Sequence, residues 1–492
     1  MFPLFHFLRR SSNRYLLSVI LLITSLILFI HVVSNSSSLN QKGIINTAKE
    51  HYESMWELVS SSNSSASGAS DDDNSLWNYE PHDAETLETI FSRLEKPLYS
   101  NEDLFREFPE LQNDTKRLEL DNGKSVLKKN KKIYDDFLAL AIDEPKVDDL
   151  VYEDDTYAGK ANAAILSLVR NEDLKTLLPA IQQMEDKFNK RFNYPYILLN
   201  ERNFTERFKE SVRSLLPPER IVKFGKIDDE DWNMPDSIDN NKYHSAVEKL
   251  KEEKVSYVDM ESYHNMCRFY SREFYHHPLL KDVKYTWRLE PGISFYCDIK
   301  YDIFQFMEMH DKVYGYVLNL YDGPESIRTL WNTTMQFVEK NPQYLNVNGA
   351  YEWLKENGQK PRNFEITNGY STCHFWTNFE ITNLEFLRSE AYEKYMDFLE
   401  NSGGFYYERW GDAPVRSIAL ALFIDKSRIH WFRDIGYNHA PYTNCPKCDP
   451  QNNRCDGKCK PGLFSIWDNL NTENCHATWI KYVMSEEEKH IY

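Results

Sequence analysis

The chain has 492 residues, of which 41% are hydrophobic and 14% aromatic, which is enough for one large or two ordinary domains with a substantial core. Its formal net charge at pH 7 is -18, and the acidic residues are spread along the whole chain. This charge excludes a nucleic-acid backbone as the expected partner, because phosphates attract basic proteins and repel acidic ones.

The N-terminal residues predict a membrane anchor. Residues 16–33, LLSVILLITSLILFIHVV, carry no charge apart from a titratable His31, and three arginines precede them. As a helix with a rise of about 1.5 Å per residue, this segment spans about 27 Å, close to the thickness of a thin secretory-pathway bilayer. A cleaved signal peptide is the alternative, but its apolar region would be shorter and its small-x-small cleavage site clearer. We expect a retained signal anchor, with residues 1–15 in the cytoplasm and the remainder in the lumen.

The segment after the anchor is too polar to form a core. Residues 34–85 are rich in Ser, Asn and Asp, which predicts a disordered stem. Residues 86–155 contain helical patterns with charged faces, for example 124–141, which predict a neck that packs on the catalytic body or extends the stem. The catalytic domain is expected over residues 156–480, followed by a tail of residues 481–492.

A lumenal body agrees with the Asn-x-Ser/Thr sequons and with the eight cysteines, all in the C-terminal half of the chain. An even cysteine count in an oxidising compartment predicts disulfides, although the sequence does not give their connectivity. The spacing of Cys445 and Cys448, and of Cys455 and Cys459, also resembles a zinc cluster. The oxidising compartment favours disulfides over zinc at these positions.

The pattern changes near Ala161, where AAILSLVRN is the short apolar run expected of a buried parallel strand. An amphipathic helix over residues 174–191 and a second strand over residues 196–199 follow, which gives a βαβ unit. Such a unit commonly opens a nucleotide-binding α/β sheet, with ligands bound beyond the carboxyl ends of the strands. The sequence has no GxGxxG and no GxxxxGK(S/T) motif, so it favours neither a Rossmann dinucleotide site nor a P-loop.

Two segments hold candidate ligands for a divalent cation. Residues 285–292, YTWRLEPG, predict a strand that ends in a turn, because Pro291 biases Glu290 toward extended geometry and Gly292 allows the reversal. The Glu290 carboxylate can meet a cation that holds a diphosphate, or it can cap a backbone amide in the turn. His439 lies in GYNHAP; a lone histidine is more often a satisfied core or loop residue, but its place after a strand-like run favours a metal. Manganese accepts imidazole and oxygen ligands, so both side chains and diphosphate oxygens form a suitable shell.

Aromatic and polar residues surround two further carboxylates. Glu380 ends the string CHFWTNFE at residues 373–380, and Asp412 lies in ERWGDAP at residues 408–414. Acids flanked by Trp, Tyr, Phe and Asn suit a pocket that stacks sugar rings and hydrogen-bonds their hydroxyls. This combination indicates carbohydrate chemistry.

Several strings, taken together and in this order, resemble fungal glycosyltransferase family 15, the type II Golgi α-1,2-mannosyltransferases that use GDP-mannose. The resemblance covers about residues 161–479, and strings of this length and aromatic content are highly specific. The strings are LVRN (168–171), SYHNMCRFYS (262–271), YTWRLEPGISFYCDI (285–299), CHFWTNFEI (373–381), SGGFYYERWGDAPVRSIALAL (402–422) and DIGYNHAPYTNCP (434–446).

The resemblance implies a fold and a metal site. The fold would be an α/β domain of GT-A-like type, with a mixed, mostly parallel central sheet flanked by helices. Glu-Pro-Gly would take the place usually held by Asp-x-Asp. Glu290, with Pro291 and Gly292, would lie at the metal-diphosphate site, and His439 would coordinate Mn²⁺.

The resemblance also implies roles in catalysis and substrate binding. Glu380 would be the candidate nucleophile near the anomeric carbon, and Tyr263 and Asp412 would organise the acceptor and the reaction centre. Three further side chains would contact substrate: Arg170 would face the nucleotide, and Trp376 and Asn378 would line the sugar site.

Members of this family retain the α configuration, which leaves two routes open. Glu380 attacks to form a covalent mannosyl-enzyme, or it stabilises an oxocarbenium-like ion while acceptor and diphosphate exchange on one face. The expected partners are the donor GDP-mannose, a mannoside or mannosylated glycoprotein acceptor, the Golgi membrane through the anchor, and a complex of Golgi transferases.

The sequence departs from the family pattern at a few positions. Residue 416 is Arg where the family usually has His, residue 272 is Arg where Gly is usual, and Ser371-Thr372 replaces Asn-Leu. Added positive charge could favour an anionic acceptor, so transfer of mannose 1-phosphate is the nearest enzymatic alternative. Two further hypotheses are a catalytically weak mannan-binding protein and a glycosidase. The presence of Glu290, Glu380, Asp412 and His439 together argues against the mannan-binding protein. The anchor and the whole-domain resemblance argue against the glycosidase.

Overall fold

The computed structural model describes residue 79 and residues 81–100, scattered positions from 102 to 109, and residues 115–140, 161–447, 455–456 and 458–492. These residues belong to one compact unit, Ser75–Tyr492. The predicted cytoplasmic tail, the predicted anchor and the predicted stem up to residue 78 lie outside the described residues. In the described ranges, no helix has the length and apolar character needed to cross a membrane.

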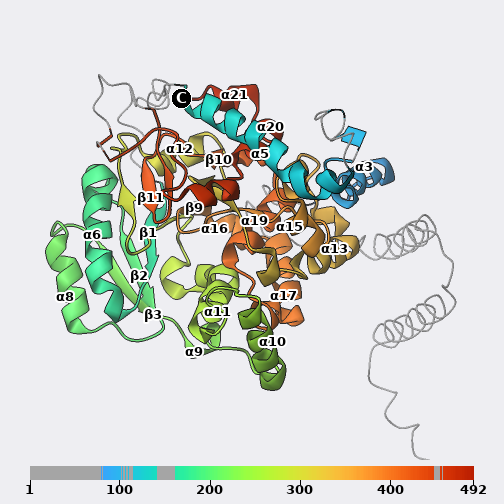
Figure 1. Cartoon of the computed structure of the whole chain (residues 1–492). Coiled ribbons are helices and arrows are strands. Elements are labelled where there is room, and N and C mark those ends of the chain that lie inside the picture. The colour runs from blue at the N-terminus through green and yellow to red at the C-terminus, as the bar shows by residue number, and fades with distance from the viewer. Residues whose placement is uncertain are drawn as a thin grey trace, which may run out of the picture. The chain divides into compact units, whose positions relative to one another are not determined.

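The core of the unit is a sheet of seven strands in the order β10-β6-β9-β4-β1-β2-β3 (Figure 1). Every neighbouring pair is parallel except the pairs made by β9, which runs antiparallel to β4 and β6. This arrangement confirms the expected mixed, mostly parallel sheet. The strands are β1 (Ala163–Leu168), β2 (Tyr196–Asn200), β3 (Val222–Lys226), β4 (Tyr285–Arg288), β6 (Tyr314–Tyr316), β9 (Glu380–Asn383) and β10 (Ile429–Trp431).

The βαβ unit forms where the sequence predicts it. β1 is buried over nearly its whole length and β2 entirely, which explains their continuous apolar runs. Glu185 lies in the connection between these two strands, and its buried carboxylate accepts hydrogen bonds from Arg220 at 2.7 and 3.0 Å and from the Tyr196 hydroxyl at 2.7 Å. The predicted helix is confirmed, with one irregular turn. Its parts are α6 (Leu174–Met184), a π-helical turn (Glu185–Asn189) and α7 (Lys190–Phe192).

Two smaller sheets and many helices complete the unit, and Figure 1 shows α6 and α8 together at the β1–β3 end of the large sheet. The small sheets have the orders β12-β11-β5 and β7-β8. Their strands are β5 (Ser294–Phe295), β7 (Asn319–Tyr321), β8 (Cys373–Phe375), β11 (Tyr437–His439) and β12 (Tyr442–Asn444). The other helices are α3 (Ala84–Glu95), α5 (Thr115–Leu138), α8 (Glu206–Leu215), α9 (Asp229–Trp232), α10 (Asn240–Glu252), α11 (Glu261–Arg268), α12 (Ile303–Met309), α13 (Leu330–Lys340), α14 (Tyr351–Leu354), α15 (Pro361–Ile366), α16 (Leu384–Leu387), α17 (Glu390–Ser402), α18 (Gly404–Tyr407), α19 (Asp412–Phe423), α20 (His476–Tyr482) and α21 (Glu486–Lys489).

Helices from the predicted neck contact the body of the unit. On α3, Arg93 forms an ion pair with Glu352 of α14 at 2.7 Å. On α5, the ring of Tyr134 lies 5.5 Å from the ring of His476, the first residue of α20. The same tyrosine ring meets Phe464 edge to face at 6.3 Å. Both helices are therefore attached through side chains that are far away in the sequence.

Three disulfides confirm the preference for sulfur cross-links over zinc. They join Cys297 to Cys455, Cys373 to Cys475, and Cys445 to Cys459. In the described part of the chain, the only group of three side chains with the spacing of a metal site is Cys297, Cys455 and Cys459. All three sulfurs belong to disulfides, so this group does not bind a metal. The remaining described cysteine, Cys267, is buried and unpaired, and Cys448 lies outside the described residues.

Candidate active site

The register of two strands brings two acids to one edge of the sheet. β4 ends at Arg288, just before Glu290, whereas β9 begins at Glu380. Because β9 runs antiparallel to β4 with Trp287 opposite Ile381, Glu380 lies beside the carboxyl end of β4. Ligands of α/β sheets bind at this edge.

The predicted turn over residues 290–292 forms and is fixed to β1. Gly292 has a φ of +81°, a backbone conformation that favours glycine. The Leu289 amide donates to the Leu166 carbonyl at 2.8 Å, and the Leu289 carbonyl accepts a hydrogen bond from the Ser167 hydroxyl at 2.7 Å. These two bonds place the Glu290 carboxylate at the end of the sheet.

A buried arginine joins two of the predicted site carboxylates. Arg288 donates from Nε to Glu290 at 2.6 Å and from Nη1 to Asp412 Oδ2 at 2.7 Å. Its guanidinium lies 3.5 Å from the centroid of the Tyr270 ring. The Thr377 hydroxyl also donates to Asp412 Oδ2, at 2.8 Å. Arg288 was not predicted as a site residue, although its position two residues before the Glu290 acid is the signal that could have identified it.

The Glu380 carboxylate is buried in this cluster, with only 2% of the residue exposed. Its Oε2 atom makes no hydrogen bond to a described residue and lies 3.7 Å from Nε of Arg416. Burial raises the pKa of Glu380, the positive charges of Arg416 and Arg288 oppose the rise, and the Asp412 charge adds to it. A buried carboxylate oxygen that accepts no hydrogen bond is suited to act on an electron-poor carbon.

Both arginines that depart from the family pattern are paired with acidic side chains. Arg416 is fully buried and has Glu380 as its ion-pair partner. Arg272 forms ion pairs with Glu273 at 2.8 Å and Asp397 at 2.6 Å. Both added positive charges therefore have carboxylate partners within the chain.

His439 reaches the Glu290 turn through strand pairing. β5 follows this turn directly and pairs with β11, whose last residue is His439. The imidazole meets the Trp376 ring edge to face, with 5.2 Å between ring centroids. Trp376 packs in the same way against Tyr442 at 5.0 Å. The histidine and the tryptophan therefore line one wall together.

The side chains at this wall fit a divalent cation. His439 Nδ1 is buried and has no hydrogen-bond partner in the described ranges. Burial lowers the pKa of His439, and the nearby Glu290 charge opposes this shift, so the imidazole is neutral at neutral pH. A neutral imidazole nitrogen and a carboxylate oxygen are ligands that Mn²⁺ accepts. Glu290 and His439 are thus the residues that could hold the metal.

Tyr263 lies on α11 beside the carboxylate cluster. Its ring stacks on Tyr257 with 4.8 Å between centroids and an interplanar angle of 16°, and the Arg409 guanidinium lies 5.6 Å from the ring centroid. Burial raises the pKa of the Tyr263 hydroxyl, with a further contribution from the Asp412 charge. The hydroxyl therefore stays protonated and can donate a hydrogen bond.

Two other predicted residues bond to other partners. Asn378 accepts hydrogen bonds from the Tyr437 hydroxyl, at 3.0 Å on its side chain and 3.2 Å on its carbonyl, so it orients β11. Arg170 follows β1 and is exposed, and its guanidinium pairs with Asp173 at 3.1 Å. Among the contacts described, neither residue bonds directly to Glu290, Glu380 or Asp412.

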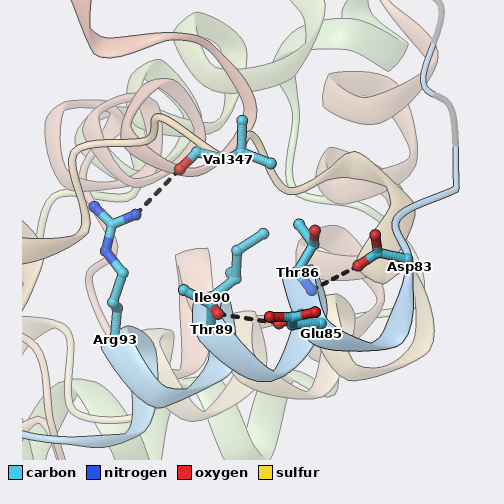
Figure 2. Close-up of a pocket in the computed structure, with 7 residues that line it drawn as sticks. All are labelled: Asp83, Glu85, Thr86, Thr89, Ile90, Arg93 and Val347. Atoms are coloured by element: carbon cyan, nitrogen blue, oxygen red, sulfur yellow. Dashed lines mark hydrogen bonds between the residues drawn. The ribbon is translucent and has the colours of Figure 1, made fainter.

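Two cavities lie outside the carboxylate cluster. One, of about 300 Å³, lies against α3 beside Val347, where Arg93 donates to the Val347 carbonyl (Figure 2). The other, of about 370 Å³, is lined by Glu201 after β2 and by Ser262, next to Tyr263 on α11. The second cavity is at the ligand-binding edge of the sheet, and no local pattern predicts it because its walls come from separate segments.

Comparisons with known proteins identify the family of the chain. The sequence profile of glycosyltransferase family 15, described as glycolipid 2-alpha-mannosyltransferase, matches residues 117–484. The chain is 52% identical to the probable mannosyltransferase KTR4 of Saccharomyces cerevisiae over 99% of this chain and 100% of that one. The structure of the S. cerevisiae mannosyltransferase Ktr4p in complex with GDP has a TM-score of 0.78 and 57% identity, over 84% of this chain and 100% of that chain. The Mn/GDP form of core-mannan synthase A from Aspergillus fumigatus has a TM-score of 0.64 and 44% identity, over 67% of this chain and 87% of that chain. The chain therefore belongs to glycosyltransferase family 15, the glycolipid 2-alpha-mannosyltransferase family.

Proposed function

We propose that the chain transfers mannose from GDP-mannose to a mannoside acceptor, with retention of configuration and formation of an α-1,2 linkage. The observation that carries this proposal is the cluster at the end of β4, where Arg288 joins Glu290 to Asp412 beside the buried Glu380. GDP in the Ktr4p complex and the Mn/GDP form of the A. fumigatus enzyme support the choice of donor and metal. The assignment of the fold as GT-A-like belongs to the same proposal.

Glu290 and His439 would hold Mn²⁺ at the donor diphosphate. When bound, the cation would offset the negative charge that grows on the diphosphate as the sugar leaves. Arg288 keeps the Glu290 carboxylate in place through the 2.6 Å hydrogen bond. We assign Arg170, at the end of β1, to the nucleotide side of the donor, in line with the usual position of nucleotides beyond parallel strands.

Glu380 would act at the anomeric carbon of the donor. Either it attacks this carbon and the acceptor then displaces it, or its charge stabilises an oxocarbenium-like ion. Asp412 would orient the acceptor: the hydrogen bonds from Arg288 and Thr377 both fall on Oδ2, and Oδ1 would receive a sugar hydroxyl. Tyr263 would donate to the acceptor.

Aromatic side chains would hold the sugar rings. Trp376, on the same wall as His439, offers a face of the kind on which pyranose rings pack, and Asn378 sits two residues further along the same loop. The chain would work in N-linked, O-linked or cell-wall mannan synthesis, as a single-pass type II Golgi membrane protein anchored by residues 16–33. A mannosylated glycoprotein acceptor and a complex of Golgi transferases are its proposed partners.

The test is a donor assay with the full chain in detergent. GDP-mannose, Mn²⁺ and a panel of α-mannosides are supplied, with UDP-glucose as the control donor, and the nucleotide product is identified by chromatography. We expect GDP and a mannosylated acceptor from GDP-mannose alone. Release of GMP with a phosphodiester product would instead assign mannose 1-phosphate transfer. GDP binding without transfer to any acceptor on the panel would contradict the proposal in favour of a mannan-binding protein.

A further inference from the structure

Arg416 occupies a position where the family resemblance leads one to expect His, and its guanidinium is fixed from two sides. Nη1 donates to the Tyr392 hydroxyl at 2.8 Å, and Nη2 donates to the Tyr270 carbonyl at 2.6 Å. The Tyr392 hydroxyl in turn donates to the Ser271 carbonyl at 2.8 Å. The arginine is fully buried, so these bonds hold a cation at a fixed point inside the protein.

The third nitrogen of this guanidinium faces Glu380. Arg416 Nε lies 3.7 Å from Glu380 Oε2, which is close enough for an ion pair but longer than a hydrogen bond. Neither atom has a hydrogen bond to any other residue that the structure describes. The charge of Arg416 therefore acts on Glu380 while the lone pairs of Oε2 stay unused.

Other charged and titratable groups face Glu380 from the surrounding elements. Arg288 on β4 is the second cation, but it already pairs with two carboxylates. Among the described ion pairs, Arg416 has Glu380 as its only carboxylate partner. Asp412 opposes both cations from α19. The remaining groups are the phenols of Tyr314 on β6, Tyr270 in the π-helical turn Phe269–Glu273, and Tyr392 on α17.

We propose that Arg416 is a positioning residue for Glu380: its fixed guanidinium keeps the carboxylate ionised without covering Oε2. The inference rests on the proposed role of Glu380 in mannosyl transfer. Both routes for Glu380, attack on the anomeric carbon and stabilisation of a positive ion, require the ionised carboxylate. Burial alone favours the protonated acid, and a fixed cation nearby opposes that preference.

The first test compares pH profiles of kcat/KM for mannose transfer by the full chain. In Arg416→Met and Arg416→His, we expect the acid limb to move to higher pH by about one unit or more, because an opposite charge at this distance lowers a carboxyl pKa by about 1–3 units. Arg416→Lys keeps the charge but loses the planar fork, so its acid limb should stay near that of the wild type while kcat falls. Arg272→Met removes an arginine that pairs with Glu273 and Asp397 instead, so it is the matched control and should leave the limb in place.

A second readout does not depend on transfer. Infrared difference spectra recorded during a pH titration show the carbonyl band of a protonated carboxyl group, and Glu380→Gln identifies the part of this band that belongs to Glu380. We expect this band in Arg416→Met at pH values where the wild type lacks it, with GDP affinity unchanged as a check on the fold. A uniform loss of rate with an unmoved acid limb, or no such band in Arg416→Met, would overturn the proposal. If the wild-type chain transfers no mannose, the proposed function fails and the infrared titration still decides the role of Arg416.

Discussion

Of the side chains around Glu290, Glu380 and Asp412, Arg288 is expected to be the one whose replacement destabilises the protein most. Arg288→Met removes the cation that lies 2.6 Å from Glu290 and 2.7 Å from Asp412, and it leaves Asp412 with the Thr377 hydroxyl as its bonded partner. The Asp412 side chain is 8% exposed, so little water can replace the lost hydrogen bond. The Glu290 side chain is 18% exposed, so water can partly solvate its charge.

Removing one partner of a buried ion pair costs about 3–5 kcal/mol. At about 2.1 cal/mol/K of unfolding entropy per residue, for a unit that spans Ser75–Tyr492, this corresponds to a fall in Tm of about 3–6 °C. Scanning calorimetry or thermal circular dichroism of the full chain measures this fall. Arg362→Met is the matched control, since Arg362 has an equally short 2.6 Å ion pair with Glu325 but is 70% exposed, and it should cost less than about 1 kcal/mol.

The double variant Arg288→Met with Asp412→Asn tests the reason for the effect. Because the asparagine leaves no uncompensated charge at position 412, this variant should be less destabilised than Arg288→Met alone. The reasoning is refuted if Arg288→Met and Arg362→Met change Tm equally, or if Asp412→Asn gives no recovery.

The disulfide between Cys373 and Cys475, which are 102 residues apart in the sequence, should contribute about 2–5 kcal/mol to stability. Replacing both cysteines by serine should therefore lower the Tm measured without reductant, and reductant should no longer lower the Tm through this bond. His439→Ala should raise the Mn²⁺ concentration for half-maximal activity by about tenfold or more, and a Mn²⁺ titration in which it is unchanged would remove His439 from the metal site. Burial lowers the pKa of His476 from its usual 6.5 to about 3, so below pH 6.5 the unfolded chain binds a proton that the folded chain does not. The free energy of unfolding therefore decreases as the pH is lowered from 6.5 to about 3. Denaturant titrations of His476→Gln should show a shallower loss of stability over that window than the wild type does.

The local sequence pattern was sufficient to predict the first two strands of the large sheet and the helix between them. β1, the helix after it and β2 form at the expected positions because the apolar periods of strand and helix are strong there. The π-helical turn within the helix was not foreseeable from the local pattern, and its first residue, Glu185, bonds to Arg220, which lies 35 residues away. The turn over residues 290–292 was predicted because proline and glycine restrict the backbone locally.

Long-range contacts account for what the sequence alone did not predict. Arg288 contacts Asp412 across 124 residues, and this contact exists only because the strand that precedes Glu290 ends beside the start of α19. The even cysteine count predicted disulfides but not their partners, because pairing depends on which loops the fold brings together. The sequence showed added positive charge at residues 272 and 416 but not the carboxylates that pair with these arginines in the fold.

The most direct measurement of the central claim is the anomeric configuration of the first product, followed by proton NMR while the full chain acts on GDP-mannose, Mn²⁺ and an α-mannoside. We predict an α-linked product from the wild-type chain and a loss of transfer of at least about 10²-fold in Glu380→Gln, because the amide can neither attack the anomeric carbon nor carry the charge that stabilises it. An initial product with β configuration, or a Glu380→Gln variant as active as the wild type, would contradict the assignment of Glu380 and the retaining mechanism built on it.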